Sequence, residues 1–355
     1  MTVTVRSLTS GCKIEDESRA VSFRLNAAGH WSTFRSGGNF YRRCVDGRIV
    51  RGAAAESLDA QQTSNIYQQA YQSLQALNTD EPLVQKSCEY SPEYYLRLGQ
   101  QYFNVYHEPV SILPPDRYAD LVVQPAKGCP NRQCSFCIFY KDKPYSVLNK
   151  EQLQQHLTGL KTLFAEAVLN RQGVFLGSAN SMALSQRRLR ESLQMIQQSF
   201  GSFKRGVATF ADPDFSAKRT AADWQELYDL GLRHVVIGLE TGWGVLRAKL
   251  GKSDQLDKVE AMIAATRFAN ISVGLTLLTG ITEINEQQEN AQITLQFLQR
   301  QLLDRRDMIY LSPLQQHGLV SAQADSELKL LSDTLKPHIK AKVVHYQMQR
   351  FNYYA

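Results

Sequence analysis

Short apolar runs alternate with longer amphipathic stretches from about residue 120 to residue 311. The apolar runs are rich in β-branched residues and are bounded by glycine or polar residues, which predicts buried strands. We expect these strands at residues 121–124, 173–176, 206–209, 234–239, 272–278 and 308–311. Between them, apolar residues recur at steps of three and four, which predicts helices at residues 150–169, 186–200, 221–230, 255–269 and 283–303.

This alternation predicts an α/β fold with a parallel sheet. Six strand–helix units are too few to close an eight-stranded barrel, so we expect a partial (β/α)6 barrel over residues 116–315. Chemistry in such a fold lies at the carboxyl ends of the strands. Residues 316–355 are expected to form a C-terminal extension.

Residues 1–115 follow a different pattern and predict an N-terminal α+β accessory domain. Short strand-like runs lie at residues 20–25, 31–34 and 39–43, and the pair Asp46-Gly47 is typical of a tight hairpin. Helical periodicity then covers residues 58–77 and 92–105. The pair Pro114-Pro115 marks the junction with the barrel.

Composition excludes few classes of protein. Of the 355 residues, 43% are hydrophobic and 21% are charged, which is ordinary for a globular domain. No apolar run approaches the roughly 20 residues of a membrane span, and the first residues lack an apolar signal core. We therefore expect a cytoplasmic protein without a membrane partner. The net charge of +6 comes from basic residues scattered along the sequence, so nucleic acid is not indicated.

Three cysteines, Cys129, Cys134 and Cys137, lie within nine residues directly after the first predicted strand. Thiolates are soft ligands, and three of them can hold three irons of a cubane cluster while the fourth iron stays open. A zinc site would need a fourth Cys or His nearby, and none follows within ten residues. The spacing therefore favours an iron–sulfur site, with a zinc site and inert thiols as the alternatives.

The Cys-x4-Cys-x2-Cys spacing, Phe136 before the last cysteine and the Phe139-Tyr140 pair after it resemble the radical S-adenosylmethionine (SAM) superfamily. The strand-end segments at residues 174–180, 236–242 and 272–280 are similar to that family's SAM-binding motifs, and the resemblance covers residues 118–313. It implies that the three cysteines bind a [4Fe–4S] cluster. It also implies SAM contacts from Phe136, Phe139, Gly177, Ser178, Ala179, Glu240 and Thr241.

The resemblance implies an enzyme that cleaves SAM reductively to a 5′-deoxyadenosyl radical, which abstracts hydrogen from a substrate that the sequence does not name. A flavodoxin or ferredoxin-type protein is the expected electron donor. Candidate substrate residues, by position alone, are Asp212, Asp214, Thr279 and Ser312.

Two departures from the family pattern stand out. The first gap between cysteines is four residues where three is commonest, and Gly177-Ser-Ala replaces the usual glycine-glycine-glutamate. One alternative is an RNA-modifying enzyme of the methylthiotransferase kind, with a second cluster on Cys12, Cys44 and Cys88, although inert buried thiols are the simpler interpretation. Another is a non-catalytic, zinc-stabilised α/β binding protein.

Overall fold

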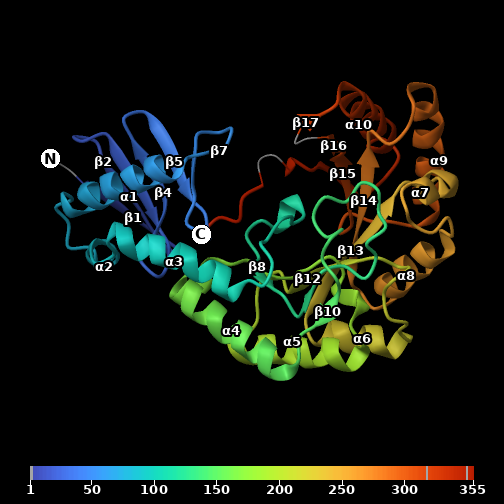
Figure 1. Ribbon diagram of the computed structural model, residues 1–355, viewed down its shortest axis with the longest axis horizontal. Helices are drawn as coiled ribbons and strands as arrows, with labels where there is room; N and C mark the ends of the chain where they lie inside the picture. Colours follow the sequence, from blue (N-terminus) through green and yellow to red (C-terminus); the bar gives the residue numbers. More distant parts are fainter. Residues whose placement is uncertain (1–2, 317–318, 349–350) are drawn as a thin grey trace.

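The computed structural model describes residues 3–316, 319–348 and 351–355 (Figure 1). Its N-terminal part is an antiparallel sheet in which each strand pairs with the next along the chain. The strands are β1 (Val3–Leu8), β2 (Gly11–Asp16), β3 (Val21–Leu25), β4 (Trp31–Ser36), β5 (Asn39–Arg43), β6 (Ile49–Arg51) and β7 (Glu56–Ser57). The hairpin predicted at Asp46-Gly47 is confirmed, because β5 pairs with β6 around it.

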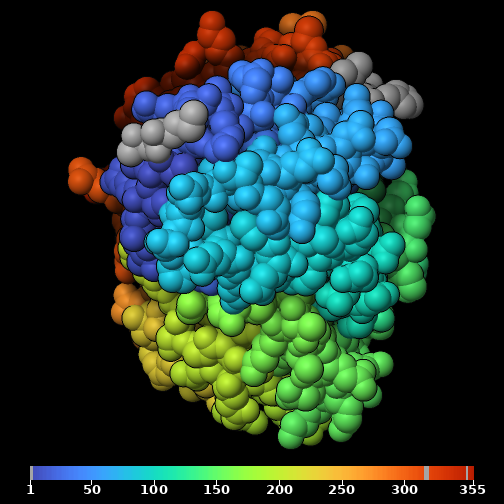
Figure 2. All heavy atoms as spheres, turned by 90° about the vertical axis from the view of Figure 1, so that its left-hand side faces the viewer, coloured from blue at the N-terminus to red at the C-terminus, as the bar shows by residue number. Residues whose placement is uncertain are grey.

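Three helices pack on the inner face of this sheet: α1 (Ala60–Gln75), α2 (Pro82–Cys88) and α3 (Pro92–Val105). In Figure 2 these helices, light blue to cyan, lie across the middle of the molecule. Side chains alternate along the strands, so that Ile14, Phe23 and Phe34 join the core while their neighbours point outward. The strands β1 and β2 and the helix α2 were absent from the sequence-based prediction.

The second sheet is parallel and its strands follow one another in chain order. They are β8 (Leu121–Val123), β11 (Val174–Leu176), β12 (Val207–Ala211), β13 (Leu232–Glu240), β14 (Ser272–Thr279), β15 (Met308–Pro313) and β18 (Lys342–His345). The outer helices are α4 (Lys150–Phe164), α5 (Gln186–Phe200), α6 (Ala221–Asp229), α8 (Asp257–Phe268), α9 (Gln287–Arg300) and α10 (Ala322–Leu335). Figure 1 shows α4, α5, α6, α8 and α9 around the outside of the sheet.

The predicted fold class, an α/β partial barrel with an N-terminal α+β part, is confirmed. All six predicted strands are present, and β18 adds a seventh from the segment expected to be an extension. The helix predicted to reach residue 169 ends at Phe164, since Ala165 has a φ of 43° and a 3-10 turn follows. The helix predicted from residue 283 begins at Gln287, after a 3-10 turn.

The C-terminal residues return across the open edge of β8 to the N-terminal sheet (Figure 1). The Tyr353 hydroxyl accepts a hydrogen bond from the Val122 amide (2.9 Å), and the Tyr106 hydroxyl donates one to the Val122 carbonyl (3.0 Å). The Val45 amide donates to the Tyr353 carbonyl at 2.9 Å. Edge strands expose unpaired backbone groups, and here two tyrosines satisfy them.

Candidate functional site

The cysteine loop begins at the carboxyl end of the first barrel strand and is closed at its base by backbone contacts. Gly128 has a φ of 67°, and a Cβ placed there would lie 2.3 Å from the Pro144 carbonyl oxygen. The Cys129 amide donates a hydrogen bond to the Lys143 carbonyl at 3.2 Å. The short strands β9 (Ala126–Lys127) and β10 (Ser146–Val147) pair across the same base. Glycine is therefore required where the two ends of the loop meet.

All three cysteines of the motif line one cavity of ≈ 190 Å³ at the carboxyl ends of the strands. The loop itself also contributes Asn131, Phe136, Ile138, Phe139 and Tyr140 to the wall. The rest of the wall is Ile112, Ala179, Asn180, Phe210, Ala211, Asp212, Val236, Gly238, Glu240, Lys252, Thr276, Leu278, Ser312, Pro313, Leu314, Gln315, Tyr346 and Met348.

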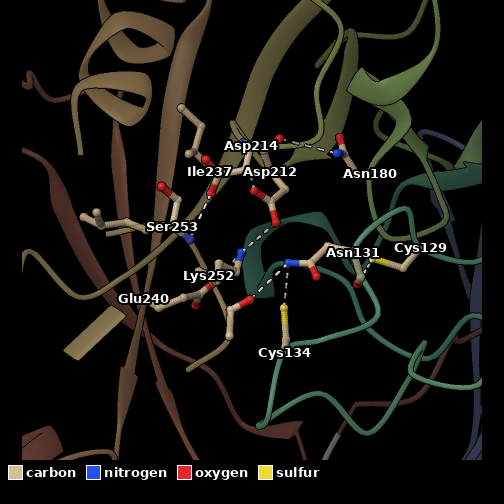
Figure 3. A network of polar contacts seen from close by, with 12 residues as sticks. Cys129, Asn131, Cys134, Asn180, Asp212, Asp214, Ile237, Glu240, Lys252 and Ser253 are labelled. Atoms are coloured by element: carbon tan, nitrogen blue, oxygen red, sulfur yellow. Dashed lines mark hydrogen bonds and ion pairs between the residues drawn. The ribbon is translucent and has the colours of Figure 1, made fainter. Parts of the chain in front are cut away.

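Asn131 organises the four-residue gap between the first two cysteines (Figure 3). Its side-chain oxygen accepts from the Gln133 amide (3.1 Å), its carbonyl accepts from the Cys129 thiol (2.8 Å), and its side-chain nitrogen donates to the Cys134 sulfur (3.3 Å). The extra residue in the gap is thus taken up by a local turn closed by the Asn131 side chain. Asn131 is buried at the centre of the loop.

Burial favours the protonated form of two of these thiols, Cys129 and Cys134. It raises the pKa of Cys129 to about 11 and the pKa of Cys134 to about 12. Among the described residues, no three potential ligands already stand close enough together to hold an ion. Binding of a metal group by these thiols would release their protons. The donor set, three thiols around one cavity whose described wall residues include no other Cys or His, fits a cubane with one open iron.

A buried ion-pair triad, Lys252 with Asp212 and Glu240, lies beside the cysteine loop (Figure 3). The Lys252 Nζ atom is 3.1 Å from Asp212 Oδ2 and 3.0 Å from Glu240 Oε1, and its side chain is 6% exposed. Burial alone would lower the pKa of Lys252. The two carboxylates raise this pKa by more than burial lowers it, so the pKa of Lys252 lies well above its usual range. Burial likewise opposes ionisation of Asp212, yet Lys252 holds the pKa of that carboxyl below its usual value.

Glu240 has the left-handed backbone conformation, with a φ of 67°, at the end of β13. The pairing of β13 with β14 shifts register between Gly238 and Glu240, which turns the Glu240 side chain toward the cavity. A Cβ at Gly238 would lie 2.6 Å from Glu240 Oε1 and 2.7 Å from Lys252 Nζ, so glycine leaves room for the ion pair. Such conformations cost about 1–2 kcal/mol in a non-glycine residue, and they concentrate at functional sites.

The segment after the short helix α7 (Gly244–Lys249) joins the triad to the cysteine loop. Arg247 is fully buried, pairs with Asp214 at 3.3 Å and donates to the carbonyls of Leu239 and Ser253. A Cβ at Gly251, whose φ is 78°, would lie 2.4 Å from the Gln133 carbonyl oxygen. The cysteine loop therefore packs directly on the backbone of this segment.

The residues predicted to contact SAM divide into two groups. Phe136, Phe139, Ala179 and Glu240 line the cavity with the cysteines. The other three, Gly177, Ser178 and Thr241, are not part of its wall. The Thr241 hydroxyl donates to Asn290 (2.6 Å), and the Ser178 hydroxyl lies 3.3 Å from a Glu108 carboxylate oxygen. Contact of these seven residues with SAM is a prediction from the sequence.

Of the predicted substrate residues, Asp212 and Ser312 line the cavity. Asp214 instead holds Arg247, and the Thr279 hydroxyl donates to the Ala324 carbonyl at 2.9 Å. Neither of these two is part of the cavity wall.

Sequence reasoning missed three residues of the site. Asn131 and Lys252 carry no motif, and Glu108 precedes the barrel, where its carboxylate accepts a hydrogen bond from the Gly128 amide (2.9 Å). The loop position of Asn131, between two motif cysteines, was the one available signal. For Lys252 and Glu108 no local pattern exists, because each acts on a distant segment.

The remaining cysteines, Cys12, Cys44 and Cys88, are free thiols on separate elements. Cys12 lies on β2, Cys44 forms a backbone bridge with Tyr354, and Cys88 ends α2. Burial raises the pKa of Cys12 to about 11 and that of Cys44 to about 12. The described residues give no metal-binding group in which these three cysteines come together.

No protein-family model matches the chain, and no curated protein matches it. Within the described part of the chain, none of the helices combines the length and apolar character needed to cross a bilayer. The chain is similar in structure to solved radical SAM enzymes, the superfamily that its sequence resembles.

One is the radical SAM methyltransferase TsrM from Kitasatospora setae, with 14% identity and a TM-score of 0.41 over 55% of this chain and 36% of TsrM. Another is coproporphyrinogen III oxidase, HemN, from Escherichia coli, with 15% identity and a TM-score of 0.44 over 61% of this chain and 51% of HemN. A third is SuiB from Streptococcus suis, solved with SAM bound, with 10% identity and a TM-score of 0.47 over 97% of this chain and 72% of SuiB. At these identities and scores, the similarity does not assign a reaction.

Proposed function

We propose that this chain is a radical SAM enzyme in which Cys129, Cys134 and Cys137 hold one [4Fe–4S] cluster. One observation carries the proposal: three thiols from a single loop surround one cavity, and no other Cys or His is among the described residues of its wall. The cavity opens where the strands of a parallel partial barrel end, which is where such folds place their chemistry. When bound, the cluster and SAM supply an electron and a 5′-deoxyadenosyl radical that takes hydrogen from a substrate.

The chain's own residues would bind and orient SAM. In the triad, Lys252 compensates two carboxylates, so the cavity keeps hydrogen-bond acceptors without a large excess of negative charge. The second oxygen of Glu240 lies 3.4 Å from the Thr276 hydroxyl and faces the same cavity. Carboxylate oxygens accept hydrogen bonds from ribose hydroxyls and ammonium groups, which are both parts of SAM.

Exclusion of water is the second task of the cavity. Phe136 and Phe139 from the cysteine loop, with Phe210, Val236 and Leu278 from or beside the strands, form an apolar wall. A reactive radical needs such a wall, because open solvent permits competing reactions.

The electron donor that we propose is a flavodoxin or ferredoxin-type protein. Ile138 is 66% exposed on the cysteine loop, and the exposed Arg132 and Lys141 lie in the same loop. An acidic donor would meet complementary charge beside the cluster. We propose the cytoplasm as the location of the protein. An iron–sulfur cluster and six free cysteines both suit its reducing conditions.

Anaerobic reconstitution with iron and sulfide tests the proposal. We expect about four irons per chain, visible absorbance from the cluster, and release of 5′-deoxyadenosine from SAM under dithionite. The Cys134→Ala variant should stay folded and release none. About eight irons per chain would favour the methylthiotransferase alternative, and zinc without iron would refute the proposal.

A further inference from the structure

Basic residues that are scattered in the sequence form one row on the outer face of the N-terminal sheet. Strand register places Arg6 opposite Lys13, Lys13 opposite Arg24, Arg24 opposite Thr33, and Thr33 opposite Arg42. The side chains of Arg6, Lys13 and Arg24 are exposed, whereas the alternate positions of these strands point into the core. The row therefore crosses five strands, and four of its five members are cations.

Stability does not explain this row. Like charges directly opposite one another on a sheet are destabilising, and Lys13 has a cation on both sides. Lys13 pairs with Glu15 at 2.6 Å, but both side chains are 49% exposed, so the pair contributes little. Among the described residues, Arg6, Arg24 and Arg42 have no carboxylate partner. A favourable external anion would offset the repulsion.

The row continues into a groove at the junction with the barrel. A hollow of ≈ 590 Å³ is lined by Arg24 from the row and by Arg171, Leu169, Phe203 and Lys204 from the barrel side. Arg171 is held in place there by Phe164 and Tyr353, whose rings lie 4.6 and 5.0 Å from its guanidinium carbon. The groove therefore presents fixed positive charge beside aromatic and apolar side chains.

A second hollow of ≈ 600 Å³ shares Ser202, Phe203 and Lys204 with the first, so the two form one track. Its further cations are Arg117, Arg205 and Arg233. Three aspartates reduce the positive charge at this end. Asp229 lines the hollow, Asp116 pairs with Arg205 and Arg117 at 3.2 Å, and Asp120 pairs with Arg117 at 3.4 Å. The positive charge is thus strongest between the row and Lys204.

We infer that the row and the adjoining groove bind a single-stranded nucleic acid, a function beyond the proposed radical chemistry and independent of it. Successive cations along a groove neutralise successive phosphates of one strand. Aromatic rings that bases can stack upon accompany the cations: Phe40 lies under Arg35 (4.5 Å) on the same sheet face, and the Tyr354 ring lies under Arg42 (3.4 Å). A flat anionic membrane would not reach the cations recessed in the groove.

The test uses the full chain, with and without its cluster, and two probes: fluorescein-labelled 20-nucleotide oligo-uridine RNA and oligo-thymidine DNA. Fluorescence anisotropy from 50 to 200 mM KCl should give saturable binding of a labelled strand. The double variant Lys13→Glu with Arg24→Glu should bind about tenfold more weakly or worse. Its log–log salt slope should be shallower by about 1.4, near 0.7 for each lost phosphate contact.

The matched control is Arg187→Glu with Lys336→Glu, an identical change in net charge at two exposed positions away from the row, one in α5 and one at the C-terminal cap of α10. It should stay within about twofold of the unmodified chain. The neutral pair Lys13→Gln with Arg24→Gln, expected to fold and to lose part of the affinity, guards against misfolding caused by charge reversal.

Three outcomes would overturn the inference. The first is the absence of salt-dependent binding of either oligonucleotide, and the second is equal weakening by the test and control variants. The third is binding to phosphatidylserine vesicles in sedimentation without binding to either strand. Because none of these readouts needs iron or SAM, failure here leaves the proposed radical chemistry untouched, and failure of that chemistry leaves this inference standing.

Discussion

Replacing Gly251 with alanine tests whether the segment after α7 positions the cysteine loop. Gly251 has a φ of 78°, and the added Cβ would lie 2.4 Å from the Gln133 carbonyl oxygen and 3.3 Å from the Cys134 Cα atom. These are backbone atoms, so no side-chain rotation can relieve the overlap, and the loop must move.

The expected loss of stability follows from three contributions. The left-handed conformation costs alanine about 1–2 kcal/mol, and reduced freedom of the unfolded chain returns about 0.4–1 kcal/mol. Overlap in a packed region adds about 1–3 kcal/mol. We therefore expect Gly251→Ala to lower the free energy of unfolding by about 2–4 kcal/mol.

Gly52→Ala is the matched control, because Gly52 has a φ of 66° and nothing within 4 Å of its added Cβ. It should lose only about 1 kcal/mol. Urea denaturation of both variants measures the difference, and iron content after reconstitution measures the loop. Iron should be normal in the control and reduced in Gly251→Ala. Equal destabilisation of the two variants, or full iron in both, would refute the reasoning.

Three further predictions concern buried charge. Lys252→Met leaves two carboxylates uncompensated and should lower the free energy of unfolding by about 3–5 kcal/mol, measured by urea denaturation; an unchanged midpoint would contradict the buried triad. Glu327→Ala removes a fully buried carboxylate that accepts hydrogen bonds from two backbone amides, a hydroxyl and a side-chain amide. It should lower the free energy of unfolding by about 3 kcal/mol in the same assay. The control Glu289→Ala, at an exposed site, should change the free energy of unfolding very little. Burial lowers the pKa of His156 to about 4, below the roughly 6.5 of an unfolded histidine. The unfolded state therefore binds more protons, and His156 should lower the free energy of unfolding by about 2 kcal/mol between pH 7 and pH 5. A His156→Gln variant whose stability falls equally steeply over this range would disprove the contribution of His156.

Local sequence patterns predicted much of the barrel. The six core strands were predicted correctly because strands of a buried parallel sheet are short, nearly continuous apolar runs, which can be recognised in the sequence itself. The strands β1 and β2 were missed because their exposed positions carry polar or charged residues, such as Thr4, Arg6 and Lys13, so neither contains a continuous apolar run. The strand β18 was missed because only four residues form it, and its pairing with β15 supplies the support that its sequence lacks.

The amino-acid sequence alone determined the cysteine loop, since three thiols within nine residues must lie close together in any fold. Tertiary structure decided the rest of the site. Lys252 meets Asp212 and Glu240 only because parallel strands end side by side, and the strained φ of Glu240 comes from strand pairing rather than from residue type.

The row of cations shows the same division. Arg6, Lys13, Arg24 and Arg42 stand 7 to 18 residues apart and look like scattered surface charges in the sequence. Antiparallel register brings them into line across five strands. Spacing along a chain reports only local neighbours, whereas the pairing of strands sets which distant side chains share a surface.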